Sequence, residues 1–344
     1  MTQVNFNELF GNFSAADALA ATEETKKSSY SGSENLYKPS FKDEKCTDQN
    51  YTALVRFIPF YHDGKWRTVI GRWECFLKDV NGENGIFVVS PKTDGKKCPM
   101  RTLSWKLYNS ESAIDKENSK KINVYQQFYA LVEIVHDKQH PEYEGKVFIY
   151  QFGKTIADKL EAAMKSSAYT EGFNPFDLYD GKLFEINVTK DATKKVNGNP
   201  VSNVDGCRFI EKTAPIHFTV GDQKMTLTKD RDAQQAFFNW LQKDAPKMED
   251  YFWKEWDAET TEKVNANLAT YTSNYVAPRN TVAAVKEAVN AATQTETPAQ
   301  PTPVPVVEDM PDFTGESAKT PEIPADETPV SAEEEDWINK VLNG

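Results

Sequence analysis

The chain has 344 residues, of which 39% are hydrophobic and 27% are charged, and its formal net charge at pH 7 is −12. The mean hydropathy is −0.64 and no 18 apolar residues run together, so neither a membrane span nor a secretory signal peptide is expected. The four cysteines stand far apart without a CxxC pair, which argues against a disulfide framework and favours a reducing cytoplasm.

Residues 1–30 are predicted to form an N-terminal helical arm. Large apolar residues occupy the i, i+3, i+4 and i+7 positions of a narrow helical stripe: Phe6, Leu9, Phe10 and Phe13. The basic pair Lys26 and Lys27 then leads into a loop rich in Ser and Gly. Such an arm either packs on its own body or docks on a neighbouring molecule, and the spacing does not choose between them.

Residues 31–275 are predicted to form the core, mainly β with helical insertions (α+β). Short β-branched and aromatic runs, separated by Gly, Asn, Asp and Pro, indicate strands at 53–58, 68–70, 85–89, 129–135, 146–152, 182–188 and 215–218. Strands at this spacing favour a closed or partly open barrel. Apolar residues at helical spacing predict helices at 154–166 and 231–243, and a looser one within 249–292.

The strand 146–152 has an aromatic face. Alternation places Lys146, Phe148, Tyr150 and Phe152 on one face and Val147, Ile149 and Gln151 on the other. Three rings on one face form either part of a core or a platform on which unpaired bases stack, with nearby lysines following the phosphates. Tyrosines with a polar tip, such as Tyr125 and Tyr150, suit a wet stacking surface better than Phe148.

The segment around this strand carries a family resemblance. Residues 141–160, PEYEGKVFIYQFGKTIADKL, resemble nearly residue for residue the signature segment of the single-stranded DNA-binding (helix-destabilising) proteins of T-even-type tailed bacteriophages. Weaker similarity at 53–59, 97–109 and 214–216 extends the resemblance over roughly 50–220. The resemblance implies an oligonucleotide-binding (OB) barrel whose cleft holds single strands, an arm for cooperative binding and an acidic tail that recruits partners.

The resemblance also implies contact residues. It places Tyr108, Phe128, Tyr129 and Tyr150 on aromatic positions of the family's cleft, and Arg56 on a cleft arginine. Two further aromatic positions fall on Val201 and Val204, and a basic triplet falls on Asn123, Val124 and Tyr125, with Lys120 and Lys121 a few residues upstream. Together with the aromatic and basic residues chosen from the strand patterns, the expected single-stranded DNA contacts are Arg56, Tyr108, Lys120, Lys121, Tyr125, Phe128, Tyr129, Tyr150, Phe152 and Lys154.

Neither a cofactor nor catalysis is expected. The family holds zinc with one His and three Cys, but only Cys75 and Cys98 are available here, because Ser90 and Arg101 stand at the other two positions. Structural zinc needs four ligands, so zinc is not expected. GxxxxGK[ST], HExxH, GxSxG and dinucleotide motifs are absent and the four histidines are scattered, so the protein is not expected to be an enzyme.

The acidity of the chain belongs to its C-terminal segment. Residues 296–344 hold twelve acidic side chains against two lysines, a net charge of −10. The proline-rich stretch within 276–330 is predicted to be a disordered linker. Residues 331–344 form an acidic amphipathic tip, with Ser331 and Glu334 at capping-box spacing. The tip residues expected to bind partner proteins are Glu334, Glu335, Asp336, Trp337, Ile338, Val341 and Leu342.

These observations predict a single-stranded DNA-binding protein that cooperatively coats single strands during phage DNA replication, recombination and repair. The expected partners are single-stranded DNA, replication and recombination proteins through the tail, and other copies of the chain through the arm, with no membrane. The expected location is the cytoplasm of the infected bacterial host. Two alternatives stay open: a single-stranded RNA binder acting as a translational regulator, and a phage scaffold or assembly protein whose aromatic residues are merely core.

Overall fold

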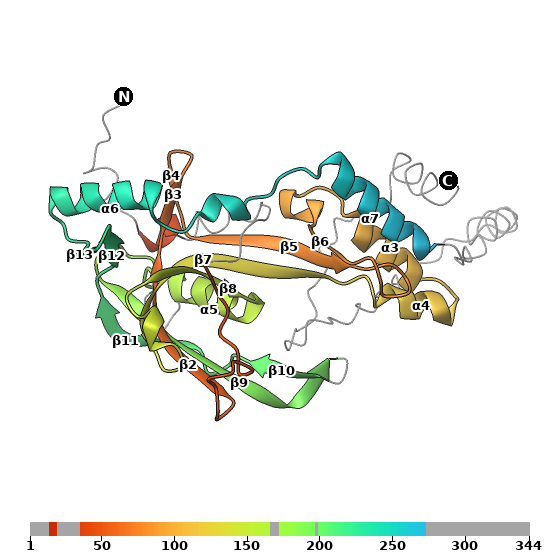
Figure 1. Ribbon diagram of the computed structural model, residues 1–344, viewed down its shortest axis with the longest axis horizontal. Coiled ribbons are helices and arrows are strands. Elements are labelled where there is room, and N and C mark those ends of the chain that lie inside the picture. Colours follow the sequence, from red (N-terminus) through yellow and green to blue (C-terminus); the bar gives the residue numbers. More distant parts are fainter. Residues whose placement is uncertain (1–13, 19–34, 166–171, 197–198, 273–344) are drawn as a thin grey trace, which may run out of the picture. The chain divides into compact units, whose positions relative to one another are not determined.

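The computed structural model describes residues 14–18, 35–165, 172–196 and 199–272 (Figure 1). The stripe at 6–13, the pair Lys26 and Lys27, and the acidic tail lie outside the described residues. The described chain divides into two compact units. Unit 1 takes its residues from Met1–Glu74, Val89–Lys97 and Tyr125–Glu255, and unit 2 takes its residues from Cys75–Val88, Cys98–Val124 and Trp256–Gly344.

A mixed sheet contains most of the strands of unit 1, while the end of β5 and most of β6 in this sheet belong to unit 2. Its strands follow the order β1-β8-β7-β2-β9-β10, with β11 also paired to β9, β5 to β7, and β6 to β5. The β1–β8 pair is parallel, while β8–β7, β7–β2, β2–β9, β9–β10 and β9–β11 are antiparallel. The bounds are β1 (Leu36–Tyr37), β2 (Asn50–Ile58), β5 (Val69–Leu77), β6 (Ile86–Val89), β7 (Val124–Asp137), β8 (Val147–Phe152), β9 (Gly181–Val196), β10 (Asn199–Asn203) and β11 (Arg208–Ala214).

Two short hairpins accompany this sheet. They are β3 (Phe60–His62) with β4 (Lys65–Arg67), and β12 (His217–Val220) with β13 (Gln223–Thr226). The first hairpin turns at Asp63 and Gly64, whose φ angles are 51° and 78°. Left-handed backbone at both turn positions matches the twist of the flanking strands, and Asp-Gly tolerates it with little strain.

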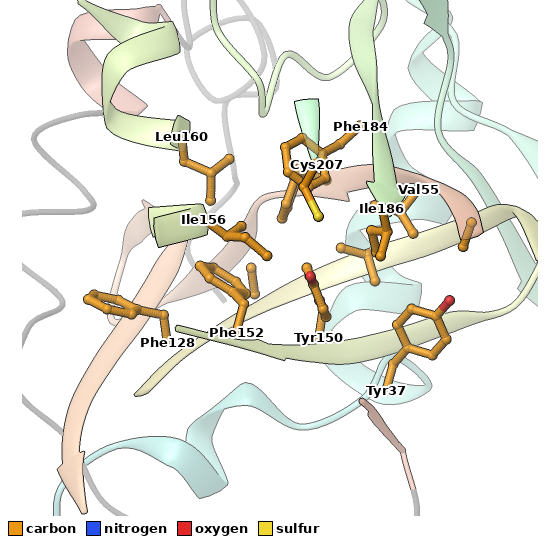
Figure 2. Close-up of a cluster of buried hydrophobic side chains, with 14 of the residues drawn as sticks. Tyr37, Val55, Phe128, Tyr150, Phe152, Ile156, Leu160, Phe184, Ile186 and Cys207 are labelled. Atoms are coloured by element: carbon orange, nitrogen blue, oxygen red, sulfur yellow. The ribbon is translucent and has the colours of Figure 1, made fainter. Parts of the chain in front are cut away.

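The two faces of β7 and β8 enter different cores. Tyr150 and Phe152 lie in a first core, where α5 (Lys154–Met164) contributes Ile156 and Leu160 (Figure 2). Ile149, between the two rings in sequence, lies instead in a second core with residues of α6 (Arg231–Lys243). The period-2 alternation of the strand therefore places one helix against each face. Three 3-10 turns complete the connections: η1 (Pro91–Asp94), η2 (Pro141–Tyr143) and η3 (Met248–Tyr251).

Unit 2 has its own helical core. It contains α3 (Pro99–Tyr108), α4 (Ala113–Ser119) and α7 (Ala258–Thr270). The buried residues of its third core include Cys75, Leu77, Val88, Cys98, Met100, Leu103, Leu107, Ile122, Val264, Leu268 and Tyr271. Side chains of the α7 region hold the loop after β5: Asn267 Nδ2 donates to Asn84 O at 2.8 Å, and the Tyr271 hydroxyl donates to Lys78 O at 2.9 Å.

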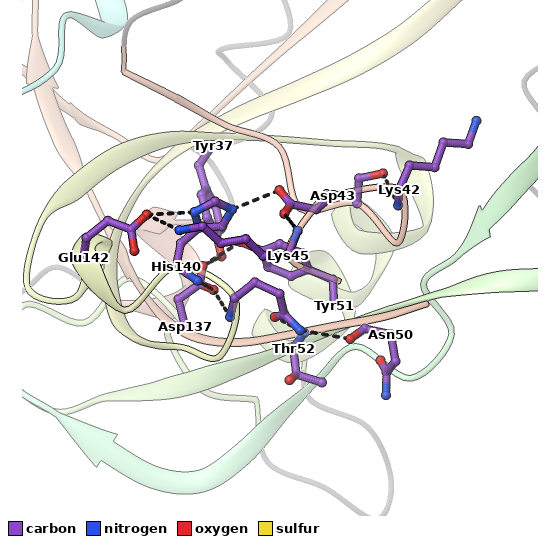
Figure 3. A network of polar contacts seen from close by, with 12 residues as sticks. Tyr37, Lys42, Asp43, Lys45, Asn50, Tyr51, Thr52, Asp137, His140 and Glu142 are labelled. Atoms are coloured by element: carbon purple, nitrogen blue, oxygen red, sulfur yellow. Dashed lines mark hydrogen bonds and ion pairs between the residues drawn. The ribbon is translucent and has the colours of Figure 1, made fainter. Parts of the chain in front are cut away.

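A polar network fixes the loop that precedes β2 (Figure 3). Asp137, 1% exposed, accepts hydrogen bonds from the hydroxyls of Tyr37 and Tyr51, both at 2.7 Å. His140 next to it contacts Asp43 through Nε2 at 2.9 Å and Glu142 through Nδ1 at 3.0 Å. Asp137 is thus a buried carboxylate with several donors, and His140 is an imidazole between two carboxylates. Together they hold three segments of the chain at one place.

The prediction of a β-rich α+β fold is confirmed. Each predicted strand run has an observed strand in or beside it, and the helices predicted at 154–166 and 231–243 appear as α5 and α6. Helices α3 and α4 were not predicted. Among the described residues, no helix combines the length and the apolar composition needed to cross a membrane.

Candidate nucleic-acid interface

The aromatic face of β8 belongs to the core. Tyr150 is 2% exposed and Phe152 is 4% exposed, and both point toward α5 in Figure 2. Phe128 of β7 is 8% exposed and stacks on Phe152, with ring centroids 6.0 Å apart and planes 15° apart. These three predicted contact residues fill the first core, so a base cannot reach them in this structure.

Tyr129 lies in a buried charged cluster on the other face of β7. Its hydroxyl donates to Glu74 and accepts from Arg72 at 3.1 Å, and the Arg72 guanidinium stands 4.5 Å from the Tyr129 ring centroid. The same guanidinium lies 5.1 Å from the ring of Tyr251. Burial, together with the nearby Glu74 carboxylate, raises the pKa of the Tyr129 hydroxyl. The hydroxyl therefore serves this internal network.

Arg56 is enclosed by backbone. The side chain is completely buried, and burial lowers the pKa of its guanidinium to about 10. A Cβ on Gly181 would lie 2.1 Å from Arg56 Cζ, so only glycine leaves room for the guanidinium. Its nitrogens donate to the carbonyl oxygens of Phe57, Pro175, Asp177 and Ala214. In this structure Arg56 ties β2 to two loops and does not present its charge to solvent.

Accessible aromatic rings lie on α3 in unit 2. Pro at the first helical position and Cys98 as the N-cap start this helix, and its buried face fills the third core. The other face carries Arg101, Trp105 and Tyr108 at i, i+4 and i+7, and all three are half-buried. The rings of Trp105 and Tyr108 stack with centroids 5.9 Å apart and planes 21° apart. No acidic residue occurs in α3.

The predicted lysines of unit 2 follow α4, which is joined to α3 by a hydrogen bond from Ser104 Oγ to Ser119 O at 3.0 Å. Lys120 and Lys121 are both exposed, and Lys121 Nζ also donates to Val80 O at 3.0 Å. Unit 2 thus combines exposed cations with two accessible rings. This combination can hold phosphates and stack bases.

In unit 1, two of the predicted contact residues are accessible. Tyr125, at the start of β7, is half-buried. Lys154 is exposed at the first position of α5, where Nζ pairs with Asp158 at 2.9 Å. The ion pair partly neutralises Lys154, so Tyr125 is the stronger of these two candidates.

The described part of the predicted arm packs on its own body. Ser14 and Asp17 form reciprocal hydrogen bonds of 2.9 Å and 3.2 Å that cap residues 15–18. Ala18 is completely buried in the first core, and its carbonyl oxygen accepts from Thr68 Oγ1 at 3.4 Å. The predicted cooperativity residues Phe6, Leu9, Phe10, Phe13, Lys26 and Lys27 lie outside the described residues.

The residues available do not fit the zinc site that the resemblance implied. Cys75 and Cys98 are buried in the third core, where burial and the neighbouring Cys98 raise the pKa of the Cys75 thiol to about 12. Cys98 Sγ accepts from Arg101 N at 3.4 Å, and Ser90 Oγ accepts from Lys92 N at 3.2 Å. Among the described residues, no three His, Cys, Asp or Glu side chains are grouped to hold a metal. The absence of zinc stays a prediction.

Trp105 and Arg101 are candidate residues that were missing from the predicted contact set. Their spacing with Tyr108 was available as a signal, but it is visible only once 99–108 is treated as a helix.

Over part of its length, the chain is similar to known DNA-binding proteins. Residues 49–204 match the family model described as "gp32 DNA binding protein like". Two relatives, each named "Single-stranded DNA-binding protein", come from Enterobacteria phage T4 and Enterobacteria phage T2. Each is 28% identical over 179 residues, which cover 48% of this chain and 52% of the relative.

The aligned part therefore spans about half the length of each relative. The resemblance to the single-stranded DNA-binding proteins of T-even-type phages is confirmed within that part. Most of the strands of unit 1 and all of α3 and α4 lie inside residues 49–204. Through this segment, the chain resembles the gp32-like DNA-binding proteins.

Proposed function

We propose that this protein binds single-stranded DNA and coats it cooperatively during phage DNA replication, recombination and repair. The observation that carries the proposal is the family match over residues 49–204, together with relatives named for single-stranded DNA binding. The protein acts by binding and performs no covalent chemistry. It does so in the cytoplasm of the infected bacterium.

We infer that the sheet of unit 1 is an OB-type barrel. Support comes from the first core, which collects side chains from β1, β2, β7, β8 and β9. In small barrels, the strands likewise turn one face toward a common interior. Helix α5 contributes Ile156, Leu160 and Met164 to the same interior.

Contacts with the strand fall into two chemical kinds. Bases stack on Trp105 and Tyr108 of α3 and on Tyr125, because their rings are accessible while those of Phe128, Tyr150 and Phe152 are buried. Phosphates are held by exposed lysines such as Lys120 and Lys121. Stacking is tolerant of sequence because every base has a π-face, so binding is weakly sequence-dependent.

The two ends of the chain add cooperativity and recruitment. The apolar stripe at 6–13 contacts a neighbouring copy along the strand, and the tip at 331–344 binds replication and recombination proteins. The tip offers an apolar helical face behind an acidic first turn, which suits a hydrophobic groove with a basic rim.

Filter binding to poly(dT), poly(U) and duplex DNA over a series of salt concentrations tests the proposal. Poly(dT) is expected to bind best, with a slope of log affinity against log salt of about −0.7 for each phosphate contact, so roughly −2 to −3.5 for three to five contacts. Preference for poly(U) would establish the RNA-binding alternative. Binding to none of the three polymers would favour the scaffold alternative.

The stacking surface of α3 has its own test. Trp105→Ala and Tyr108→Ala should each weaken poly(dT) binding by about 1–3 kcal/mol, since each removes one ring that can stack on a base. Trp105→Phe and Tyr108→Phe retain a ring and serve as matched controls with near wild-type affinity. Equal affinities for the alanine and phenylalanine variants would remove α3 from the interface.

A further inference from the structure

The β9–β10 hairpin extends past the strand that supports it. Strand β2 pairs with β9 only as far as Asn50 opposite Thr189. The remaining residues of β9, 190–196, have only β10 as a partner among the described strands, and β10 is the last strand in the sheet order (Figure 1). This part of the hairpin is therefore a two-stranded projection with little core beneath it.

A bulge shapes the projection. On β9, Lys190 faces Ser202 and Lys195 faces Pro200, so four residues of β9 stand opposite one residue of β10. Asp191 closes the bulge, because its carboxylate accepts from Thr193 N at 2.8 Å, Thr193 Oγ1 at 2.9 Å and Lys194 N at 2.9 Å. The backbone hydrogen bonds from Lys194 and Thr193 lower the pKa of Asp191, which stays ionised and committed to the turn.

Three lysines surround this turn, and Asp191 is the only acidic residue between 189 and 203. Lys190 and Lys195 are exposed and Lys194 is half-buried. Among the described residues, none of the three forms an ion pair, whereas Lys138, Lys182 and Lys263 each hold a carboxylate at 2.6–2.8 Å. In a chain with a net charge of −12, this projection is a local site of uncompensated positive charge.

We propose that the β9–β10 hairpin is a phosphate-binding arm that holds the backbone of single-stranded DNA through Lys190, Lys194 and Lys195. The inference rests on the proposed function and adds a contact surface to it. Because the residues from 189 to 203 include no aromatic side chain, the arm contributes charge neutralisation without stacking. Its contribution is independent of base sequence and disappears at high salt.

The salt dependence of poly(dT) binding tests the arm. In the triple variant Lys190→Gln, Lys194→Gln, Lys195→Gln, the slope of log affinity against log salt should become less negative by about 2, because three phosphate contacts at about 0.7 each are lost. The corresponding triple Lys→Arg variant keeps the charges and should keep the wild-type slope. Melting temperatures of both variants should match the wild type, since the side chains have no ion pairs to lose among the described residues.

A second triple variant controls for net charge. Lys138→Gln, Lys182→Gln and Lys263→Gln remove the same total charge from lysines that already hold carboxylates, and the slope should stay at the wild-type value. The proposal would be overturned if the slope of log affinity against log salt stays unchanged in the hairpin variant, or if it changes equally in both Lys→Gln variants. A third outcome would also overturn the proposal. If the hairpin variant loses self-association but keeps the wild-type salt slope on a short oligonucleotide, the hairpin contacts an acidic protein surface instead. Failure of the wild-type protein to bind poly(dT) would instead overturn the proposed function.

Discussion

The Tyr150 ring packs among other rings of the first core, with centroid distances of 5.1 Å to Phe152 and 6.4 Å to Phe57. We expect Tyr150→Ala to lower the free energy of unfolding by about 3–5 kcal/mol, because it leaves a cavity in a packed aromatic core. Urea denaturation followed by circular dichroism measures the change.

Tyr108→Ala is the matched comparison for Tyr150→Ala. The Tyr108 ring is half-buried on α3, so its removal should cost much less stability while weakening poly(dT) binding. If Tyr150→Ala instead kept the stability of the wild type and lost affinity for DNA, the ring would belong to the binding surface.

The histidine between two carboxylates predicts a pH dependence. Burial disfavours the charged form of His140, but its contacts with Asp43 and Glu142 outweigh burial and raise its pKa above 6.5. A raised folded-state pKa adds stability that is present below the unfolded pKa and is lost as pH rises through the folded pKa. His140→Gln should therefore cost on the order of 1 kcal/mol at pH 5.5 and clearly less at pH 9.

Thermal unfolding at several pH values measures this difference. His136→Gln is a suitable control, because the His136 side chain is 60% exposed and contacts a single carboxylate, Glu144, at 2.7 Å. A surface pair of this kind contributes little to stability. An equal cost of His140→Gln at both pH values would show that its imidazole is neutral in the network.

At the scale of elements, the periodic patterns in the sequence predicted the features that depend on neighbouring residues, namely strand faces and helix positions. The alternation in 146–152 correctly separated the faces of β8, and apolar spacing located α5 and α6. The same alternation could not tell a core face from a stacking face, because both need aromatic rings in a row. That difference depends on whether α5 covers the strand, and this is a tertiary contact that the local pattern does not encode.

Arg56 shows the same limit for a charged side chain. Its position in an otherwise apolar strand is compatible with a phosphate contact and with a buried carbonyl cage. The cage is built by segments more than a hundred residues away, at Pro175, Asp177 and Ala214. Sequence spacing carries no information about such distant acceptors, so the enclosure of the guanidinium could not be predicted.

The N-terminal arm is an element whose role can be separated from folding. Deleting residues 1–13 removes the apolar stripe but keeps Ser14–Ala18, the part that packs on the first core. Binding to a short oligonucleotide should stay within about twofold of wild type, while binding to long poly(dT) should weaken by 10-fold or more, on the order of 1.4 kcal/mol, because the contacts that we propose between neighbouring copies would be lost. Fluorescence titration with both substrates measures the difference.

Deleting residues 1–30 is the informative comparison for that variant. It also removes Ala18, which is completely buried, so a lower melting temperature is expected in addition. Equal losses of affinity on the short and the long substrate, in the variant that lacks 1–13, would contradict a role between neighbours.

On the scale of the whole molecule, charge is distributed unevenly. Residues 296–344 carry −10 of the total −12, so the remainder of the chain carries only −2. Removing residues 296–344 should tighten binding to poly(dT), most strongly at low salt, since the segment repels phosphate and competes for basic surfaces. The gain should shrink as ionic strength rises, because the Debye length falls from about 30 Å at 0.01 M to about 10 Å at 0.1 M.

A double substitution separates the electrostatic role of the tail from recruitment. Trp337→Ala with Ile338→Ala removes most of the apolar face of the tip and keeps every charge of the segment. This variant should bind poly(dT) as the wild type does while losing the replication proteins that we propose as partners of the tip, and a pull-down from infected cells measures this loss. If it binds poly(dT) as tightly as the truncated chain, competition for the basic surfaces depends on the hydrophobic tip. The charge of the tail would then serve solubility and would not cause the weaker binding of the full-length chain to poly(dT).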